Sequence, residues 1–156
     1  MSLVLDYRSA RAAEEVARLK RVLVLRAMLA TGSTQRQIAE AVGVSQPAIS
    51  QQLKAFSPAE VDAATLVDAG GAILRRVAEN RGFADLAVFG SVALGQAGPD
   101  SDIDLIVKPP PGTTIRGLVD MKQVFEAILG RAVDLVTYGG LQPGIDDDIL
   151  REAVLL

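Results

Sequence analysis

The chain has 156 residues, of which 49% are hydrophobic and 22% charged, a composition typical of a soluble globular protein with one or two small domains. It contains no cysteine and no histidine, which excludes disulfide bonds, cysteine-based zinc sites and a Ser-His-Asp triad. No apolar run approaches the roughly 20 residues that span a bilayer and no signal peptide is recognisable, so we expect a cytoplasmic protein without a membrane partner.

The net charge of −3 conceals an asymmetry between two parts of the chain. Residues 1–56 carry eight Lys/Arg against four Asp/Glu, whereas residues 57–156 carry eight against fifteen. A basic N-terminal part and an acidic remainder indicate different partners. We therefore predict a first domain over residues 1–56 and a second over residues 57–156, with residues 57–82 as a helical connector.

A long helix is predicted first, from about Tyr7 to Ala30. Apolar residues recur there at three- and four-residue intervals, at Val16, Leu19 and Leu23, with Glu and Arg on the other face. Gly32 is expected to end this helix.

A helix, a glycine-containing turn and another helix follow. Thr34, with Gln37 three residues later, fits a capping box that opens the second helix. Ser45 can cap the third helix, in whose first turn Pro47 is tolerated. The apolar positions of this pair are Ile38, Val42, Val44, Ile49 and Leu53. The pattern resembles a helix-turn-helix.

The outward face of the third helix carries side chains that can hydrogen-bond to base edges or phosphates. They are Gln46, Ser50, Gln51 and Lys54. Arg36, from the preceding helix, would anchor a phosphate. The alternative is a three-helix bundle with a merely solvated face, but such faces are usually rich in Glu and Lys. We predict an operator-binding module and, because such modules usually read two-fold operators, a homodimer.

The connector is predicted to be helical. Ser57 followed by Pro58 is typical of a helix start, with Ser57 as the N-cap. The pattern then continues to Asn80, although Gly70-Gly71 weakens its middle, where we expect a break or a close helix contact.

Two carboxylates follow an apolar strand that ends at Gly90-Ser91. We predict a second strand over Ser101–Val107, and because residues two apart share a face of a strand, Asp102 and Asp104 project together. Their mutual repulsion would be relieved by a hard divalent cation such as Mg²⁺ or Mn²⁺. A strand that turns into a helix at Gly90-Ser91 presents N–H groups and one hydroxyl to phosphate oxygens.

A third carboxylate lies on a later strand, after a helix predicted over Thr114–Leu129. Asp134 interrupts the apolar run Ala132–Thr137, and a lone carboxylate in a central strand is costly unless it is paired or bound to metal. Asp134 is the natural third ligand, and an edge-strand aspartate facing solvent is the alternative. The consecutive aspartates 146–148 fit a helix start better than a second metal site.

The run Phe89-Gly90-Ser91-Val92-Ala93-Leu94-Gly95, followed by Pro99-Asp100-Ser101-Asp102-Ile103-Asp104-Leu105, resembles the minimal nucleotidyltransferase family of the polymerase-beta superfamily. The resemblance implies an α+β protein, with an N-terminal all-α helix-turn-helix bundle and a small nucleotidyltransferase domain whose short mixed sheet is flanked by helices. It implies Asp102, Asp104 and Asp134 as catalytic metal ligands, and Gly90 and Ser91 as phosphate-binding residues. The cofactor would be Mg²⁺ or Mn²⁺, and the substrate ATP or another nucleoside triphosphate.

The resemblance also implies a biological role. Family members of this size are often antitoxins, and some transfer AMP to a helical HEPN-type toxin. This chain departs from the family at Leu94, because the family commonly has Ala-Arg-Gly after Gly-Ser-x. Because the three carboxylates are intact, the resemblance leads us to expect an autoregulating, DNA-binding adenylyltransferase antitoxin, whereas Leu94 favours an alternative. The alternative is a transcriptional regulator whose weak or inactive nucleotidyltransferase-like domain serves partner binding or nucleotide sensing.

Overall fold

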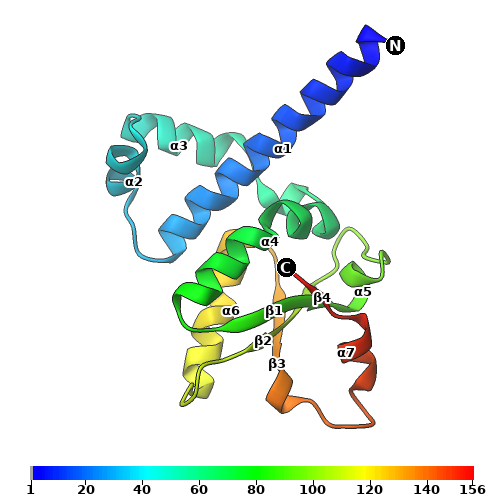
Figure 1. Ribbon diagram of the computed structural model, residues 1–156. Helices are drawn as coiled ribbons and strands as arrows, with labels where there is room; N and C mark the ends of the chain where they lie inside the picture. The colour runs from blue at the N-terminus through cyan, green and yellow to red at the C-terminus, as the bar shows by residue number, and fades with distance from the viewer. Residues whose placement is uncertain (1) are drawn as a thin grey trace.

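A 28-residue helix, α1, crosses the whole upper part of the molecule in the computed structural model, which describes residues 2–156 (Figure 1). In chain order, the elements are α1 (Leu3–Ala30), α2 (Gln35–Val42), α3 (Gln46–Ala55), η1 (Pro58–Glu60), α4 (Ala63–Asn80), β1 (Ala84–Phe89), α5 (Gly90–Ala93), β2 (Ile103–Lys108), α6 (Ile115–Leu129), β3 (Val133–Thr137), η2 (Tyr138–Gly140), α7 (Asp147–Glu152) and β4 (Val154–Leu155). No helix within residues 2–156 has the length and apolar character needed to cross a membrane.

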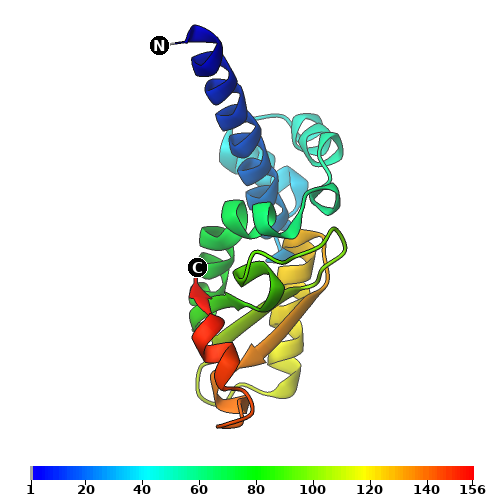
Figure 2. The same ribbon diagram turned by 90° about the vertical axis from the view of Figure 1, so that its right-hand side faces the viewer.

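The sheet has four strands in the order β3-β2-β1-β4. Strands β2 and β3 are parallel, whereas β1 runs antiparallel to both β2 and β4. Helices α4 and α6 cover one face, and the C-terminal segment with η2 and α7 covers part of the other (Figure 2). This arrangement confirms the α+β class, with a helical N-terminal part followed by a mixed sheet flanked by helices.

The C-terminal half of α1 belongs to two hydrophobic cores. Leu19, Leu23 and Ala27 pack into the main core with α4, α6 and the sheet. Leu25, only two residues after Leu23, packs into the smaller core with α2 and α3. Arg26 adds a polar connection, because its Nε donates to the carbonyls that end α6, at 3.0 Å. Burial lowers the pKa of this guanidinium.

The local start signals of the second and third helices are confirmed. Thr34 Oγ1 accepts from the Gln37 backbone N at 3.1 Å, while Gln37 Oε1 accepts from the Thr34 N at 2.9 Å. Ser45 Oγ accepts from the Ala48 N at 3.2 Å. Thr114 caps α6 in the same way, by accepting from the Gly117 N at 3.1 Å. Side chain and backbone within four residues determine each start, which is why sequence reveals it.

The start of the first helix was predicted wrongly, and two apolar residues of the helix pair are exposed. Helix α1 begins at Leu3 instead of Tyr7, because residues 3–6 have no helix-breaking residue. Val42 and Val44, two of the apolar positions of the predicted helix pair, are 47% and 41% exposed, and the side chain of Leu25 from α1 helps to fill the small core between α2 and α3.

The connector is also different from the predicted single helix. Ser57 makes no side-chain capping bond and is followed by the short 3-10 helix η1. Helix α4 instead begins after Asp62, whose carboxylate accepts from the Thr65 N at 2.9 Å and from its hydroxyl at 2.8 Å. A charged acceptor makes a stronger cap than a hydroxyl. The hydrogen bonds to Thr65 lower the pKa of Asp62.

The glycine pair in α4 marks a close contact and not a break. The helix is continuous from Ala63 to Asn80. A Cβ at Gly70 would lie 3.2 Å from Leu23 Cδ1 of α1, and one at Gly71 would lie 3.4 Å from Leu156 Cδ2. The two glycines therefore let α4 approach α1 on one side and the C-terminal strand on the other.

Candidate active site and DNA-binding surface

The parallel strands β2 and β3 place two carboxylates beside each other. Asp104 and Asp134 are register partners, and Asp104 is also the partner of Phe89, the last residue of β1. Phe89 packs on the face of the sheet opposite α4 and α6. Directly opposed residues in a sheet share a face, so both carboxylates lie on that second face.

The expectation that Asp134 lies in a central strand was wrong. Strand β3 is at the edge of the sheet, and Asp134 is exposed, as in the alternative interpretation. The reason is sheet order, which places β2 between β1 and β3. Asp134 nevertheless stands next to the half-buried Asp104.

Asp102 lies just before β2 instead of within it, and its side chain is exposed. The ladder begins only at Ile103, whose N–H donates to the Ala132 carbonyl at 3.1 Å. The preceding residues form a polar turn, in which Ser101 Oγ accepts from the Gly98 N at 2.7 Å. Asp102 therefore flanks the carboxylate pair from a loop, which the alternation argument did not anticipate.

The charges of Asp134 and Asp102 act on Asp104. The pKa of Asp104 is raised, first by burial, then by the charge of Asp134 and a hydrogen bond with it, and last by the charge of Asp102. Excess negative charge of this kind is relieved by a cation. No group of three or more acidic side chains in residues 2–156 is already drawn together tightly enough to enclose a metal ion. The structure thus brings these residues near one another without closing them into a cage.

Gly90 packs directly on Asp104. The residue has φ of +67°, in the left-handed region, and begins the four-residue helix α5. A Cβ at this position would lie 2.2 Å from Asp104 Oδ2 and 3.0 Å from its Cγ. No real side chain tolerates such a contact, so glycine is required at this turn. Ser91, the next residue, is half-buried in the first turn of α5.

Leu94 is 49% exposed at the end of α5. A cation from another part of the chain could take the role of the arginine that the family commonly has here. Lys108, one such cation, ends β2 four residues after Asp104, about 13 Å along the strand. Arg75 is engaged elsewhere, since it pairs with Glu79 at 3.9 Å and donates to the Leu156 carbonyl at 3.3 Å. Lys108 thus lies at the far end of β2 from Asp104, and Arg75 contacts Glu79 and Leu156.

Arg131 is a structurally important residue that sequence analysis did not identify. Its Nη1 donates to the Pro99 carbonyl at 2.9 Å, in the loop that leads to Asp102. Its Nη2 donates to the carbonyls of Ala59 and Val61 in the connector. The guanidinium therefore connects the loop before Asp102 to the connector segment that follows the helix-turn-helix, by hydrogen bonds to both. No local motif around Arg131 signals this, because its partners lie 32 to 72 residues away.

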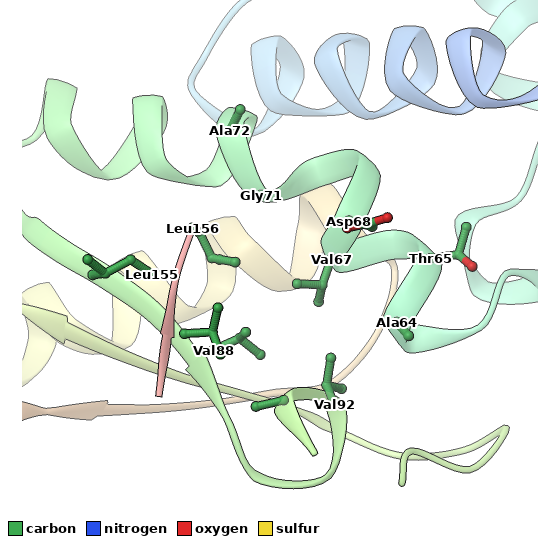
Figure 3. A pocket seen from close by; sticks show the side chains of 12 residues that line it. Ala64, Thr65, Val67, Asp68, Gly71, Ala72, Val88, Val92, Leu155 and Leu156 are labelled. Carbon is green, nitrogen blue, oxygen red and sulfur yellow. The ribbon is translucent and has the colours of Figure 1, made fainter. Parts of the chain in front are cut away.

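A pocket of about 580 Å³ lies on the other face of the sheet, between α4, α5 and the C-terminal strand β4 (Figure 3). Val67, Val88 and Leu156 contribute apolar walls, with Asp68 at the rim. Val88 points toward the helices and Asp104 points away from them. The pocket is therefore separated from the carboxylates by the sheet.

The helix-turn-helix presents most of its predicted contact residues to solvent. Gln51 and Lys54 of α3 are exposed, as is Arg36 of α2, whereas Ser50 is half-buried. Gln46 is exposed and already partnered, because its Nε2 donates to Gln35 Oε1 at 2.8 Å. The bond fixes the relative position of the side chains at the start of α2 and α3.

Comparisons with known proteins agree with this arrangement. Residues 72–156 match the family model described as a nucleotidyltransferase domain, and residues 19–57 match that of bacterial regulatory proteins of the arsR family. A candidate protein adenylyltransferase of Methanocaldococcus jannaschii is 40% identical over 68 residues, which cover 44% of this chain and 73% of the relative. The protein adenylyltransferase MntA of Thermococcus cleftensis is 35% identical over 80 residues, covering 51% and 81%.

A solved structure described as a candidate minimal nucleotidyltransferase is similar in fold. It is 35% identical, has a TM-score of 0.56, and the similarity covers 62% of this chain and 97% of that one. These findings confirm the resemblance predicted from the Gly-Ser and Asp-x-Asp runs. Because the family model spans more than half of its residues, the chain belongs to the nucleotidyltransferase-domain family, with an arsR-type helix-turn-helix ahead of that domain.

Proposed function

We propose that this protein is a magnesium-dependent nucleotidyltransferase that transfers a nucleoside monophosphate, AMP from ATP, to a hydroxyl group of another protein. The observation that supports this most directly is Asp104, with Asp134 beside it in register and Gly90 packed against its carboxylate. Both relatives described above carry protein adenylyltransferase in their names.

The donor set fits a hard divalent cation. Asp102, Asp104 and Asp134 would hold Mg²⁺ or Mn²⁺, the hard cations that carboxylate oxygens prefer. Burial, and after it the charges of Asp134 and Asp102, raise the pKa of Asp104, and a cation would favour its ionised form. When bound, the ion neutralises charge on the phosphates of the nucleotide. Gly90 and Ser91 would position the β- or γ-phosphate with N–H groups and a hydroxyl.

Attack by the acceptor hydroxyl forms a new oxygen–phosphorus bond at the α-phosphate and breaks the bond to pyrophosphate. Asp134, which is exposed at the edge of the sheet, would orient this hydroxyl and favour loss of its proton. The exposed edge leaves room for a macromolecular acceptor.

We also propose a wider role as a DNA-binding, autoregulating antitoxin that acts in the cytoplasm, with a helical HEPN-type toxin as acceptor. In this proposal residues 1–56 bind the operator as a homodimer, and residues 57–156 form the nucleotidyltransferase unit. The arsR-type match and the excess of eight Lys/Arg over four Asp/Glu in residues 1–56 support DNA binding.

Incubation with labelled ATP, Mg²⁺ and the product of the neighbouring gene tests the enzymatic proposal. We expect label on the partner protein, loss of labelling in EDTA, and a roughly 100-fold lower rate in Asp102→Asn, because one charged ligand is removed. Asp100→Asn is the matched control, since Asp100 is an exposed aspartate in the same loop. Absence of transfer while operator binding is intact would refute the enzymatic proposal.

That outcome would favour a second candidate, a transcriptional regulator with a catalytically weak or inactive nucleotidyltransferase domain. The observation in its favour is Leu94, which is half-exposed where the family commonly has arginine. In this case we expect ATP to bind without label transfer, and nucleotide to alter operator affinity.

Measurements of operator binding are expected to distinguish side chains that contact bases from side chains that contact phosphates. Gln51→Ala should weaken specific binding by about 1–2 kcal/mol and leave the salt dependence nearly unchanged. Lys54→Ala should weaken binding to all sequences and reduce the salt slope by about 1. Gel shifts at several salt concentrations measure both effects. Equal loss of specific and non-specific binding in Gln51→Ala would contradict its proposed role.

A further inference from the structure

The N-terminal half of α1 projects away from the rest of the molecule (Figures 1 and 2). Every residue from 3 to 18 is exposed. Large apolar side chains among them include Leu5, 62% exposed, and Val16, 45% exposed, which share one face of the helix, whereas Tyr7 lies on the opposite face. The segment precedes both family matches, which begin at residues 19 and 72.

A helical segment of this kind is marginal without a partner. Residues 3–18 extend for about 24 Å, and isolated helices of about 12–15 residues are barely stable in water. One exposed ion pair, Arg11 with Glu15 at 3.7 Å, contributes only a few tenths of a kcal/mol. The exposed apolar side chains indicate that another surface covers this half of the helix.

A stripe of apolar and small residues in this half continues into the buried half. Leu5, Ser9, Ala12 and Val16 follow one another at spacings of four, three and four residues, the repeat of a helix-helix seam. The next member of the series is Leu19, which is 3% exposed and packs into the main core. The same face of α1 thus contacts the protein's own core from Leu19 onward and is unpartnered before it.

We propose that a second copy of this chain covers the stripe, through antiparallel pairing of residues 3–18 with the same residues of the second copy. A parallel pair is disfavoured by the structure, because each helix carries its own folded body on the seam face from Leu19 onward, and two bodies would then compete for one space. In the antiparallel arrangement the bodies lie at opposite ends of the pair.

One register satisfies both packing and charge. Leu5 meets Val16 of the second copy, and Ser9 meets Ala12 of the second copy, so that small side chains at the centre allow close approach. Each contact occurs twice by symmetry. In this register Arg8, which borders the seam, lies opposite Glu15 of the second copy on the same flank. The seam thereby gains two intermolecular ion pairs, each between Arg8 of one copy and Glu15 of the other.

This interface deepens the homodimer included in the proposed function. Its test requires neither DNA nor nucleotide, so failure of the interface and failure of the enzymatic or operator-binding proposals are distinguishable.

Disulfide trapping tests the register directly, because the chain contains no cysteine. We expect the full-length variant Leu5→Cys/Val16→Cys to form a covalent dimer under mild oxidation. Leu5→Cys alone should stay uncrosslinked, since the two copies of residue 5 lie about 16 Å apart along the axis. Tyr7→Cys/Glu14→Cys is the matched control. In the proposed register these two positions also stand level with each other along the axis, but they lie on the outer face of the helix. Crosslinking by Leu5→Cys alone, or equal crosslinking by the control pair, would overturn the proposal.

A charge exchange tests the same interface without oxidation. Arg8→Glu should raise the dimer dissociation constant about tenfold, by replacing two attractions with two repulsions. Arg8→Glu/Glu15→Arg should restore it. Light scattering after size exclusion measures the mass of each variant. The proposal is overturned if the wild-type protein stays monomeric at micromolar concentration. This holds even if residues 3–18 then prove to bind a different protein.

Discussion

Replacement of Gly90 by alanine is expected to reduce nucleotidyl transfer at least 1,000-fold and to lower the free energy of unfolding by about 2–3 kcal/mol. Two causes add up. The left-handed backbone, with φ of +67°, costs about 1 kcal/mol for any residue with a Cβ. The Cβ would also lie 2.2 Å from Asp104 Oδ2, so that the carboxylate or the turn must move. Transfer is lost because Asp104 no longer stands beside Asp134.

Gly112→Ala separates the two causes. Gly112 has φ of +83°, and a Cβ there would have no neighbour within 4 Å. We expect a loss of about 1 kcal/mol in urea-induced unfolding and unchanged transfer of label from ATP. Full transfer by Gly90→Ala, or equal destabilisation by the two variants, would show that the contact between Gly90 and Asp104 is not important.

Asp104→Asn is expected to reduce transfer about 1,000-fold and yet to stabilise the metal-free protein. Burial and the neighbouring charges of Asp134 and Asp102 disfavour ionised Asp104, and the amide removes that charge while keeping the shape of the side chain. Solvent screening at this half-buried position keeps the gain below about 1 kcal/mol. Urea unfolding in EDTA measures it.

The sign of the pH dependence follows from the raised pKa of Asp104. Below the ordinary carboxyl pKa, both folded and unfolded chains hold the proton, and the wild-type protein and Asp104→Asn should differ little. As the pH rises, the unfolded chain ionises first, which destabilises the wild-type fold until the pH exceeds the folded-state pKa. The advantage of Asp104→Asn should therefore grow from acidic to neutral pH and then level off.

Magnesium should reverse the order of stability. Ligand binding to the folded state alone raises the free energy of unfolding, so Mg²⁺ should stabilise the wild-type protein and have little effect on Asp104→Asn. Asp100→Asn, with its exposed side chain in the neighbouring loop, should behave as wild type. An equal response of all three proteins to Mg²⁺ would contradict the metal-binding role of Asp104.

Sequence predicted best those features that depend on a few adjacent residues. The capping box of Thr34 and Gln37, the cap at Ser45 and the strand that ends at Gly90 each follow from local geometry, and the structure confirms them. The Asp-x-Asp run also predicted a strand at Asp104, where the structure has β2.

Features that depend on distant partners were less predictable. The edge position of Asp134 follows from sheet order, which no local pattern encodes. The place of Asp102 before β2 follows from a ladder bond between Ile103 and Ala132. The hydrogen bonds of Arg131 connect three segments far apart in the sequence. The clash that makes Gly90 necessary requires the position of Asp104, which only the folded sheet provides.

The shared helix α1 has a consequence for how the molecule unfolds. Leu19 and Leu23 complete the core of the nucleotidyltransferase unit, while Leu25 on the same turns completes that of the helix-turn-helix. Separation of the chain after residue 56 would remove side chains from the larger core and leave their contacts on α4 and α6 exposed to water. The two units are therefore joined into one cooperative system, in which melting α1 removes DNA recognition and the catalytic scaffold together.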